Sequence, residues 1–253
     1  MFFKIIHSIM SNSSFGVGLD FGTSNTCVVY FENGEVKVIQ VNGERTIPTC
    51  ITIQNGDIHF GSNARRNASR PNAFCYPYVK TVIGRMRNNM KAYNGLRVPY
   101  ELTESNFPNL CQVKNEQRVQ ISSPQYTVAW FLWNLVQSHE QLKDGKVGVV
   151  LTIPATYNAS QIHAFREAAE LAGLRVLGII PEPIGAALRY SQEINRFRYV
   201  VVYDLGGGTF DVSVIRHEVN DEYVILNSDG DPCIGGLRFD YALLELVSSK
   251  IRR

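Results

Sequence analysis

The sequence lacks a marked excess of either charge, because 25 Lys and Arg residues stand against 23 Asp and Glu residues, for a formal net charge of +2. Proteins that bind nucleic acid through its phosphates usually carry a clustered excess of basic residues. Long apolar runs are also missing, since Lys4, His7 and the polar residues 11–14 interrupt the apolar start well short of a membrane span. We therefore expect neither nucleic acid nor a membrane among the partners.

Cysteine is scarce, and no two cysteines have C-x-x-C spacing. The five are Cys27, Cys50, Cys75, Cys111 and Cys233, and their odd number argues against a disulfide framework of the secreted type. The start of the chain also lacks the longer apolar core and small-residue cleavage site of a signal peptide. We expect a reducing, cytoplasmic location, with residues 1–14 as a disordered extension.

Two common nucleotide-binding motifs are absent. No Gly-Lys-Ser or Gly-Lys-Thr occurs, which excludes a Walker-type phosphate loop. The segment Gly16-Val-Gly-Leu-Asp-Phe-Gly22 resembles a dinucleotide fingerprint, but its last glycine comes one residue too late. It is also followed by a strand pattern, whereas that fingerprint must open a helix. A nucleotide site in this chain must therefore be of another kind.

An internal repeat is the most informative feature that is present. Asp20-Phe-Gly-Thr-Ser-Asn-Thr26 and Asp204-Leu-Gly-Gly-Gly-Thr-Phe-Asp211 share one design, an aspartate followed by a glycine-rich turn. Each copy follows a short apolar run and precedes a second β-type run. The strands predicted before the turns are residues 15–19 and 199–203, and those predicted after them are residues 26–31 and 210–215. The repeat predicts two strand–turn–strand units.

The residue types in both turns suit the binding of phosphate. Glycine adopts positive φ without strain and lets backbone N–H groups approach phosphate oxygens closely. Threonine adds a hydroxyl donor, and an aspartate at the strand end supplies the hard oxygen that suits Mg²⁺. A single Asp-Gly-Thr turn is usually an ordinary tight turn. Two matched copies instead indicate one nucleotide held between two related lobes.

The pattern along the chain predicts an α/β fold. Residues 15–60 are typical of antiparallel strands with turns at Asn33-Gly34, Asn42-Gly43 and Asn55-Gly56, and residues 61–120 are more irregular. Helices are predicted at residues 64–69, 76–83, 124–142, 160–173 and 184–190, and strands at residues 147–153 and 174–180. This alternation predicts parallel crossovers. Strands at 199–203, 210–216 and 222–227 follow, with a last helix from about residue 237.

Five motifs, in order, resemble those of the ATPase domain of the heat shock protein 70 (DnaK-type) chaperones, within the actin-like ATPase superfamily. They are Gly18-Leu-Asp-Phe-Gly-Thr23, Ile153-Pro-Ala-Thr-Tyr-Asn158, Ile180-Pro-Glu-Pro183, the segment 204–211, and Gly230-Asp-Pro-Cys-Ile-Gly-Gly236. The resemblance runs from about Gly16 to the end and is weakest at residues 86–120. It implies an actin-like (ribonuclease H-like) α/β fold, with lobe I complete over residues 15–195. A subdomain is inserted at about 48–120, and lobe II is begun at 196–253 and truncated.

The resemblance also assigns roles to individual residues. The terminal phosphates would lie between Gly22, Thr23, Ser24 and Asn25 on one side and Gly206, Gly207, Gly208 and Thr209 on the other. Mg²⁺ with its waters, or a nearby monovalent cation such as K⁺, would be held by Asp20, Asp204 and Asp211. The implied catalytic residues are Lys80, Glu182, Thr209 and Asp211, with Lys80 orienting the attacking water. Pro154 matches the family's switch proline, which links nucleotide state to the peptide-binding domain.

The chain departs from the family pattern in two respects. Ile162 stands where the family usually has an arginine, and an apolar side chain cannot make the charge-assisted hydrogen bonds of arginine. From the resemblance we also expect the family's remaining lobe II segments, which carry the adenine contacts, to be missing, along with its linker and peptide-binding domain. Because nucleotide pockets depend largely on apolar contact, we expect reduced nucleotide affinity.

Three functions remain to be separated. The first is an ATP-binding and ATP-hydrolysing domain of a chaperone of this family, with ATP or ADP, Mg²⁺ and K⁺ as ligands. A J-domain protein and a nucleotide exchange factor would be its partners. The second is a non-catalytic or weakly nucleotide-binding interaction module, for example a viral chaperone homologue. The third, a sugar kinase of the same superfamily, is disfavoured by the segment 205–211 and by the lack of a recognisable sugar-binding region.

Overall fold

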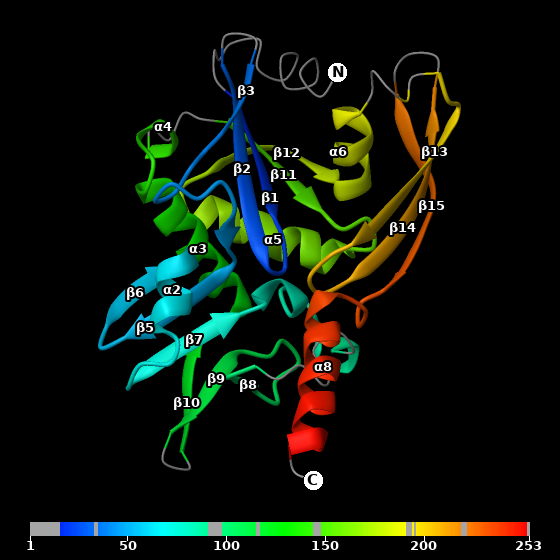
Figure 1. Ribbon diagram of the computed structural model, residues 1–253. Helices are drawn as coiled ribbons and strands as arrows, with labels where there is room; N and C mark the ends of the chain where they lie inside the picture. Colours follow the sequence, from blue (N-terminus) through cyan, green and yellow to red (C-terminus); the bar gives the residue numbers. More distant parts are fainter. Residues whose placement is uncertain are drawn as a thin grey trace.

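A mixed β-sheet forms the centre of the computed structural model, which describes residues 16–32, 35–90, 98–114, 117–143, 148–190, 194, 196–218 and 222–251 (Figure 1). The sheet has six strands in the order β12-β11-β1-β2-β3, with β4 paired to β2. Its strands are β1 (Gly16–Phe21), β2 (Asn25–Glu32), β3 (Glu35–Val38), β4 (Ile47–Pro48), β11 (Gly148–Ile153) and β12 (Arg175–Pro181). β1, β11 and β12 run parallel and the others antiparallel, which confirms the predicted crossovers.

Alternation along β1 separates the core face from a second face that carries Asp20. Leu19 and Phe21 point into the main core, where the Phe21 ring lies 5.6 Å from Phe131 and 5.4 Å from Phe165. These two partners come from helices α3 (Pro124–Gln137) and α5 (Ala159–Leu171). Because successive side chains of a strand point to opposite faces, Asp20 projects from the other face. The core packing of β1 thereby orients this carboxylate away from the apolar interior.

The predicted helix over residues 124–142 is two helices. α3 ends at Gln137, and the short helix α4 (Glu140–Lys143) follows. At the break, the Ser138 backbone N–H and hydroxyl both donate to the Leu135 carbonyl, at 3.2 and 2.7 Å. Serine side chains compete for backbone acceptors in this way, which favours helix ends over helix interiors. The apolar periodicity continued across residues 138 and 139 and concealed the break.

Helix α5 begins with a capping box that the structure shows in full. The Gln161 N–H donates to the Asn158 side chain at 3.0 Å, and the Asn158 N–H donates to the Gln161 side chain at 3.4 Å. Replacing Asn158 by alanine should lower the free energy of unfolding by about 1 kcal/mol, because it leaves a helix-start N–H group without its acceptor. Urea unfolding followed by circular dichroism would measure this loss. Asn158→Asp retains the acceptor and should keep most of the stability, so equal losses in both variants would contradict the capping role.

Two three-stranded sheets lie beside the main sheet. One has the order β6-β5-β7, from β5 (Cys50–Gln54), β6 (Asp57–Phe60) and β7 (Ala73–Pro77), and helix α2 (Gly61–Asn67) packs on it. The other consists of β8 (Glu101–Leu102), β9 (Leu110–Lys114) and β10 (Gln117–Ser122). Asn42-Gly43 and Asn55-Gly56 have positive φ at both residues, which confirms two predicted turns. Asn33-Gly34 and the extension predicted over residues 1–14 lie outside the described residues.

One helix predicted in this region is wrong. Residues 76–83 contain the end of β7 and a single 3₁₀ turn, η1 (Val79–Thr81), rather than a helix. Pro77 has no N–H to donate, and Tyr78 adopts φ 60°, which is incompatible with a right-handed helix. The other candidate, residues 64–69, is confirmed as α2, displaced by a few residues. Between η1 and β8, η2 (Arg87–Asn89) forms a second 3₁₀ turn.

The last part of the described chain forms a separate antiparallel sheet. Its order is β13-β14-β15, from β13 (Tyr199–Leu205), β14 (Phe210–His217) and β15 (Tyr223–Asp231), as predicted. Helix α6 (Glu182–Arg189) contacts both β12 and β13 and lies between the two sheets (Figure 1). Helix α8 (Gly236–Ile251) runs from the lower end of this sheet. No helix among the described residues is long and apolar enough to span a membrane.

Candidate nucleotide site

The two glycine-rich turns have the same backbone structure. In the first turn (residues 22–25), the Gly22 N–H donates to the Asn25 carbonyl at 3.0 Å. In the second turn (residues 206–209), the Gly206 N–H donates to the Thr209 carbonyl at 2.9 Å. The antiparallel pairs β1–β2 and β13–β14 flank the turns in equivalent registers. The repeat predicted from the sequence is therefore a repeat of structure.

The two turns also contact each other. A Cβ atom on Gly208 would lie 2.7 Å from Cγ2 of Thr23, and one on Gly207 would overlap the Ser24 side chain. The absence of a side chain at these two positions permits the close approach. The turns, 184 residues apart in the sequence at equivalent positions, thus form one surface built from two sheets.

The end of the segment Gly230–Gly236 and the start of α8 are hydrogen-bonded to the second turn. The Gly236 N–H donates to the Gly206 carbonyl at 3.1 Å, and the Leu237 N–H donates to the Gly207 carbonyl at 2.9 Å. A Cβ atom on Gly235 would lie within 2.9 Å of the backbone of Gly207 and Gly208. The start of α8 is therefore anchored on the turn, and the close backbone approach accounts for Gly235 in this motif.

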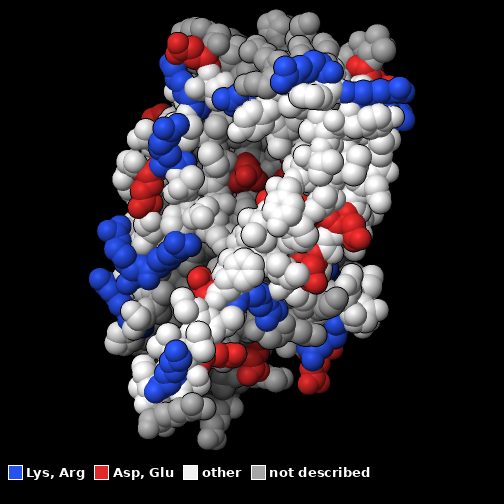
Figure 2. Space-filling model, turned by 45° about the vertical axis from the view of Figure 1, so that its right-hand side comes forward, with Lys and Arg blue, Asp and Glu red and all other residues white. Residues whose placement is uncertain are grey.

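A cleft of about 530 Å³ opens beside the paired turns. The surface is hollowed near its centre, and acidic side chains lie inside the hollow (Figure 2). The predicted site residues on the cleft wall are Asp20, Gly22, Thr23, Ser24, Asn25, Lys80, Glu182, Asp204, Gly206, Gly207 and Thr209. Gly208 and Asp211 are not among the residues that line the cleft; Gly208 lies against Thr23, and Asp211 is on β14. The cleft thus gathers residues from both copies of the repeat and from between them.

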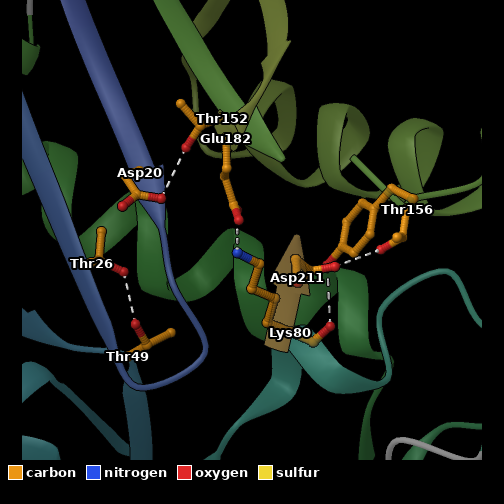
Figure 3. A network of polar contacts seen from close by, with 9 residues as sticks. Asp20, Thr26, Thr49, Lys80, Thr152, Thr156, Glu182 and Asp211 are labelled. Atoms are coloured by element: carbon orange, nitrogen blue, oxygen red, sulfur yellow. Dashed lines mark hydrogen bonds and ion pairs between the residues drawn. The ribbon is translucent and has the colours of Figure 1, made fainter. Parts of the chain in front are cut away.

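Lys80 and Glu182 form a nearly buried ion pair. Lys80 Nζ donates to Glu182 Oε1 at 2.7 Å, and the two side chains are 10% and 18% exposed (Figure 3). η1 positions Lys80, and α6 begins at Glu182. Burial by itself lowers the pKa of Lys80, whereas the Glu182 carboxylate raises it, and the net effect holds the pKa above its usual value. The ammonium group therefore keeps its charge at the edge of the cleft.

The surroundings also shift the pKa of Glu182, the other member of this ion pair. Burial raises the pKa of Glu182, and the Lys80 ammonium opposes part of that rise. The Tyr157 hydroxyl donates to the Lys80 carbonyl at 3.2 Å, which holds the backbone that carries the lysine. Lys80 is therefore held at its ammonium and at its backbone, by residues from two different elements.

Asp20 is positioned by a threonine of the neighbouring parallel strand. Thr152 is its register partner on β11, and the Thr152 hydroxyl donates to Asp20 Oδ1 at 2.9 Å (Figure 3). Thr152 was not among the predicted site residues. Thr152 carries the one hydroxyl group in the otherwise apolar strand 148–153, and this polar exception could have identified it from the sequence.

Asp211 faces Asp204 across the β13–β14 pair. Burial raises the pKa of Asp211, a hydrogen bond from the Thr209 side chain opposes the rise, and the charge of Asp204 adds to it. The Thr156 hydroxyl lies 3.5 Å from Asp211 Oδ1, at the limit of a hydrogen bond. Asp211 therefore stands in a partly buried polar cluster between the two sheets.

Thr156 and Tyr157 both follow the predicted switch residue Pro154. Pro154 is buried at the end of β11, and its carbonyl accepts from the Tyr157 N–H at 3.2 Å. This turn directs Thr156 toward Asp211 and Tyr157 toward Lys80. Both residues belong to the motif Ile153-Pro-Ala-Thr-Tyr-Asn158, but neither was a predicted site residue. Through these two neighbours, Pro154 is connected to Lys80 on the cleft wall and to Asp211 on β14.

The carboxylates suit a metal ion held through water. Asp20 and Asp204 line the cleft beside the two turns, so hard oxygen donors face the space next to the turns. Among the described residues, no group of three or more His, Cys, Asp or Glu side chains is close enough to ligate a metal directly. Mg²⁺ normally keeps several waters beside phosphates, and this donor set fits that form of binding.

The two copies of the repeat differ at one chemically important position. Cys27 is the register partner of Asp20, whereas Asp211 is the register partner of Asp204. Burial raises the pKa of Cys27, and the nearby Asp20 raises it further, so the thiol stays neutral. The acidic pair is therefore found in the second copy alone, and the site is chemically asymmetric.

A comparison with protein families agrees with this geometry. The family model described as "Hsp70 protein" matches residues 16–253, which is nearly the whole chain. The mixed sheets, the repeated strand–turn–strand units and the helices that cover them match the actin-like ATPase fold of that family. The chain therefore belongs to the Hsp70 family and is a nucleotide-binding module of the chaperone type.

Proposed function

We propose that the chain binds ATP in this cleft, with the phosphates against the paired turns, and hydrolyses it to ADP. The single observation that supports this most strongly is the contact between the turns beside one cleft that also contains the Lys80 ammonium. Two sets of backbone N–H groups and one buried cation would then surround the same phosphate group. Phosphoryl transfer to water needs positioning and charge neutralisation, without a protein nucleophile.

Each residue then has a chemical task. Lys80, held by Glu182 at 2.7 Å, would orient the attacking water and neutralise charge that develops on the phosphate. The Thr209 hydroxyl would donate to a phosphate oxygen, and Asp211 would position that threonine and the cation shell. Asp20, Asp204 and Asp211 would hold Mg²⁺ through its waters, with K⁺ nearby. Bound Mg²⁺ supplies further neutralisation of the phosphate charge.

The domain organisation is part of the same proposal. The mixed sheet would be the body of lobe I, over residues 15–195, with the subdomain of about residues 48–120 inserted in it. The sheet of β13, β14 and β15 would begin lobe II at residue 196. Hinge motion at α6, which contacts both sheets, would then open and close the cleft. Five cysteines without a disulfide bond fit a reducing compartment such as the cytoplasm.

Communication beyond the nucleotide would use Pro154 and its neighbours. Co-chaperones such as a J-domain protein or a nucleotide exchange factor are the partners that the family suggests. Ile162, which replaces the usual arginine, packs against the main core instead of presenting a charge. We therefore propose that nucleotide-dependent signalling from Pro154 is weaker in this chain than in relatives that retain the arginine.

Phosphate release from ATP tests the enzymatic proposal. The purified protein should release phosphate from ATP in the presence of Mg²⁺, and removal of divalent cations by EDTA should bring release to background, because the phosphate charge loses its neutralisation. ADP should raise the melting temperature, since a ligand that binds the folded state stabilises it. Nucleotide binding without phosphate release would favour the non-catalytic interaction module. The absence of both would contradict the proposed site.

A further inference from the structure

Two cysteines outside the cleft have their sulfur atoms in contact. Cys50 at the start of β5 and Cys75 on β7 are diagonal neighbours, because Thr52 is the register partner of Cys75. Their Sγ atoms are 3.3 Å apart, and both residues are buried. Both side chains point to the face of the small sheet that α2 covers, where Ala64 and Ala68 complete a small cluster around them.

The surroundings activate one of the two sulfurs. The two sulfurs share one hydrogen bond, in which either atom can donate. With Cys50 as the donor, this hydrogen bond lowers the pKa of Cys75, against the opposing effect of burial. Thr52 and the Arg65 guanidinium lower it further. The same hydrogen bond raises the pKa of Cys50. Because the thiolate is the nucleophile, Cys75 is the sulfur that reacts first with an oxidant.

We propose that Cys50 and Cys75 are a redox pair, which a small hydroperoxide such as hydrogen peroxide converts reversibly to a disulfide. The Cys75 thiolate attacks one peroxide oxygen, the O–O bond breaks, and Cys75 becomes a sulfenic acid as hydroxide leaves. The Cys50 sulfur then attacks Cys75 Sγ, the S–O bond breaks, and the Cys50 proton leaves with that oxygen as water. Overall, two thiols lose two electrons and two protons, and one peroxide is reduced to two waters.

A small oxidant fits the burial of this pair. Ala64, which lies over the sulfurs, is fully buried, so a bulky disulfide reagent would have to displace α2. Hydrogen peroxide is little larger than water and needs a smaller opening. The two sulfurs already touch, so the second step requires a further approach from 3.3 Å to a bond length of about 2.04 Å.

The pair is connected to the first glycine-rich turn through the residue before Cys50. The Thr49 N–H donates to the Ser24 carbonyl at 2.9 Å, and the Thr49 and Thr26 hydroxyls lie 2.9 Å apart (Figure 3). Arg65 of α2, the residue after Ala64, donates to the same Ser24 carbonyl at 3.3 Å. Two elements that contact the sulfurs therefore also hold the turn.

Oxidation should consequently change nucleotide binding, an effect that rests on the function proposed above. Diagonal neighbours of antiparallel strands start about 7–8 Å apart at Cα, farther than most disulfides span. Closing the bond must draw the start of β5 toward β7, and Thr49 moves with it. We expect nucleotide affinity to fall by about fivefold or more, a typical size for coupling between two sites.

The disulfide itself is tested by mass spectrometry on a Cys27→Ser, Cys111→Ser, Cys233→Ser variant, which retains only this pair. Hydrogen peroxide should remove two hydrogen atoms from the intact mass, and dithiothreitol should restore them. The rate should rise with pH as Cys75, whose pKa lies below the usual value of a thiol, loses its proton. If the variant does not fold, differential alkylation and peptide mapping of the wild type give the same information. Two thiols that remain alkylatable after peroxide treatment would overturn the proposal.

The nucleotide effect is tested separately, by titrating ADP into reduced and oxidised wild type and into Cys50→Ser. Oxidised wild type should bind about fivefold more weakly than reduced wild type. Cys50→Ser should show no disulfide and no such change, and its Cys75 should be trapped as a sulfenic acid that reacts with dimedone. A disulfide that leaves ADP affinity unchanged would overturn the coupling. A reduced protein that binds no ADP would contradict the proposed function, but it would not affect the evidence for the disulfide from mass spectrometry.

Discussion

Lys80→Met should reduce ATP turnover by about 100-fold or more, a typical loss when one group that stabilises developing charge is removed. The reason is the position of the ammonium group, which is nearly buried on the cleft wall and held by Glu182 at 2.7 Å. Methionine has similar length but carries no charge to neutralise the phosphate or to orient water. Nucleotide should still bind, because the turns and their N–H groups are unchanged. Single-turnover phosphate release together with ADP titration would separate these two effects.

Two further variants make the Lys80 experiment interpretable. Lys143 also pairs with a glutamate, Glu140, at 2.6 Å, but both side chains are exposed, so Lys143→Met should leave turnover and stability nearly unchanged. Lys80→Met by itself leaves Glu182 buried without its partner, which costs about 3–5 kcal/mol in comparable buried pairs. Adding Glu182→Gln should recover part of that stability without restoring turnover. Turnover that stays at the wild-type level in Lys80→Met would remove this lysine from the mechanism.

Gly207→Ala should reduce turnover by about 100-fold as well, because a displacement of about 1 Å in a catalytic arrangement has effects of that size. The new methyl group would overlap the Ser24 side chain in the opposite turn. The two turns must then separate, and the phosphates would lose simultaneous contact with both. Turnover and ADP affinity should fall together, unlike in the Lys80 variant, where we expect a fall in turnover alone.

The matched control is Gly178→Ala on β12. A Cβ atom there would meet nothing within 4 Å, and this glycine does not need the left-handed conformation, so activity and stability should stay close to wild type. The double variant Gly207→Ala, Ser24→Gly removes the atoms that the new methyl group strikes, and it should regain part of the lost affinity. If the single variant behaves like wild type, or the double variant regains nothing, the contact between the turns is not what limits binding.

Local signals predicted the secondary structure wherever they agreed with the final fold. The strands around both turns, the crossovers through α5 and the last helix were predicted because apolar periodicity, asparagine-glycine turns and capping residues act within a few residues. The prediction failed at residues 76–83, where Pro77 and the positive φ of Tyr78 divide a segment that has helical periodicity. It also failed to separate α3 from α4, because the Ser138 bonds to Leu135 leave no mark in the apolar pattern.

The residues of the candidate site were likewise predicted only in part. Repetition identified the two turns and the aspartates before them, because the same short-range backbone requirements apply to each copy. Lys80 and Glu182 entered through family resemblance, and their ion pair joins residues 102 positions apart. Thr152, Thr156 and Tyr157 had no assigned role, since their hydrogen bonds to Asp20, Asp211 and Lys80 exist only after the strands have paired.

The sequence by itself was sufficient to predict the two glycine-rich turns, the α/β fold and the family of this chain. Only the tertiary structure brings the two turns into contact and places Lys80 against Glu182 beside them. It also brings the sulfurs of Cys50 and Cys75 together, next to the residue that holds the first turn. The physical reason is range: dihedral preferences and apolar periodicity act over a few residues, whereas steric contact, ion pairing and hydrogen bonding act between any groups that packing brings within a few ångströms.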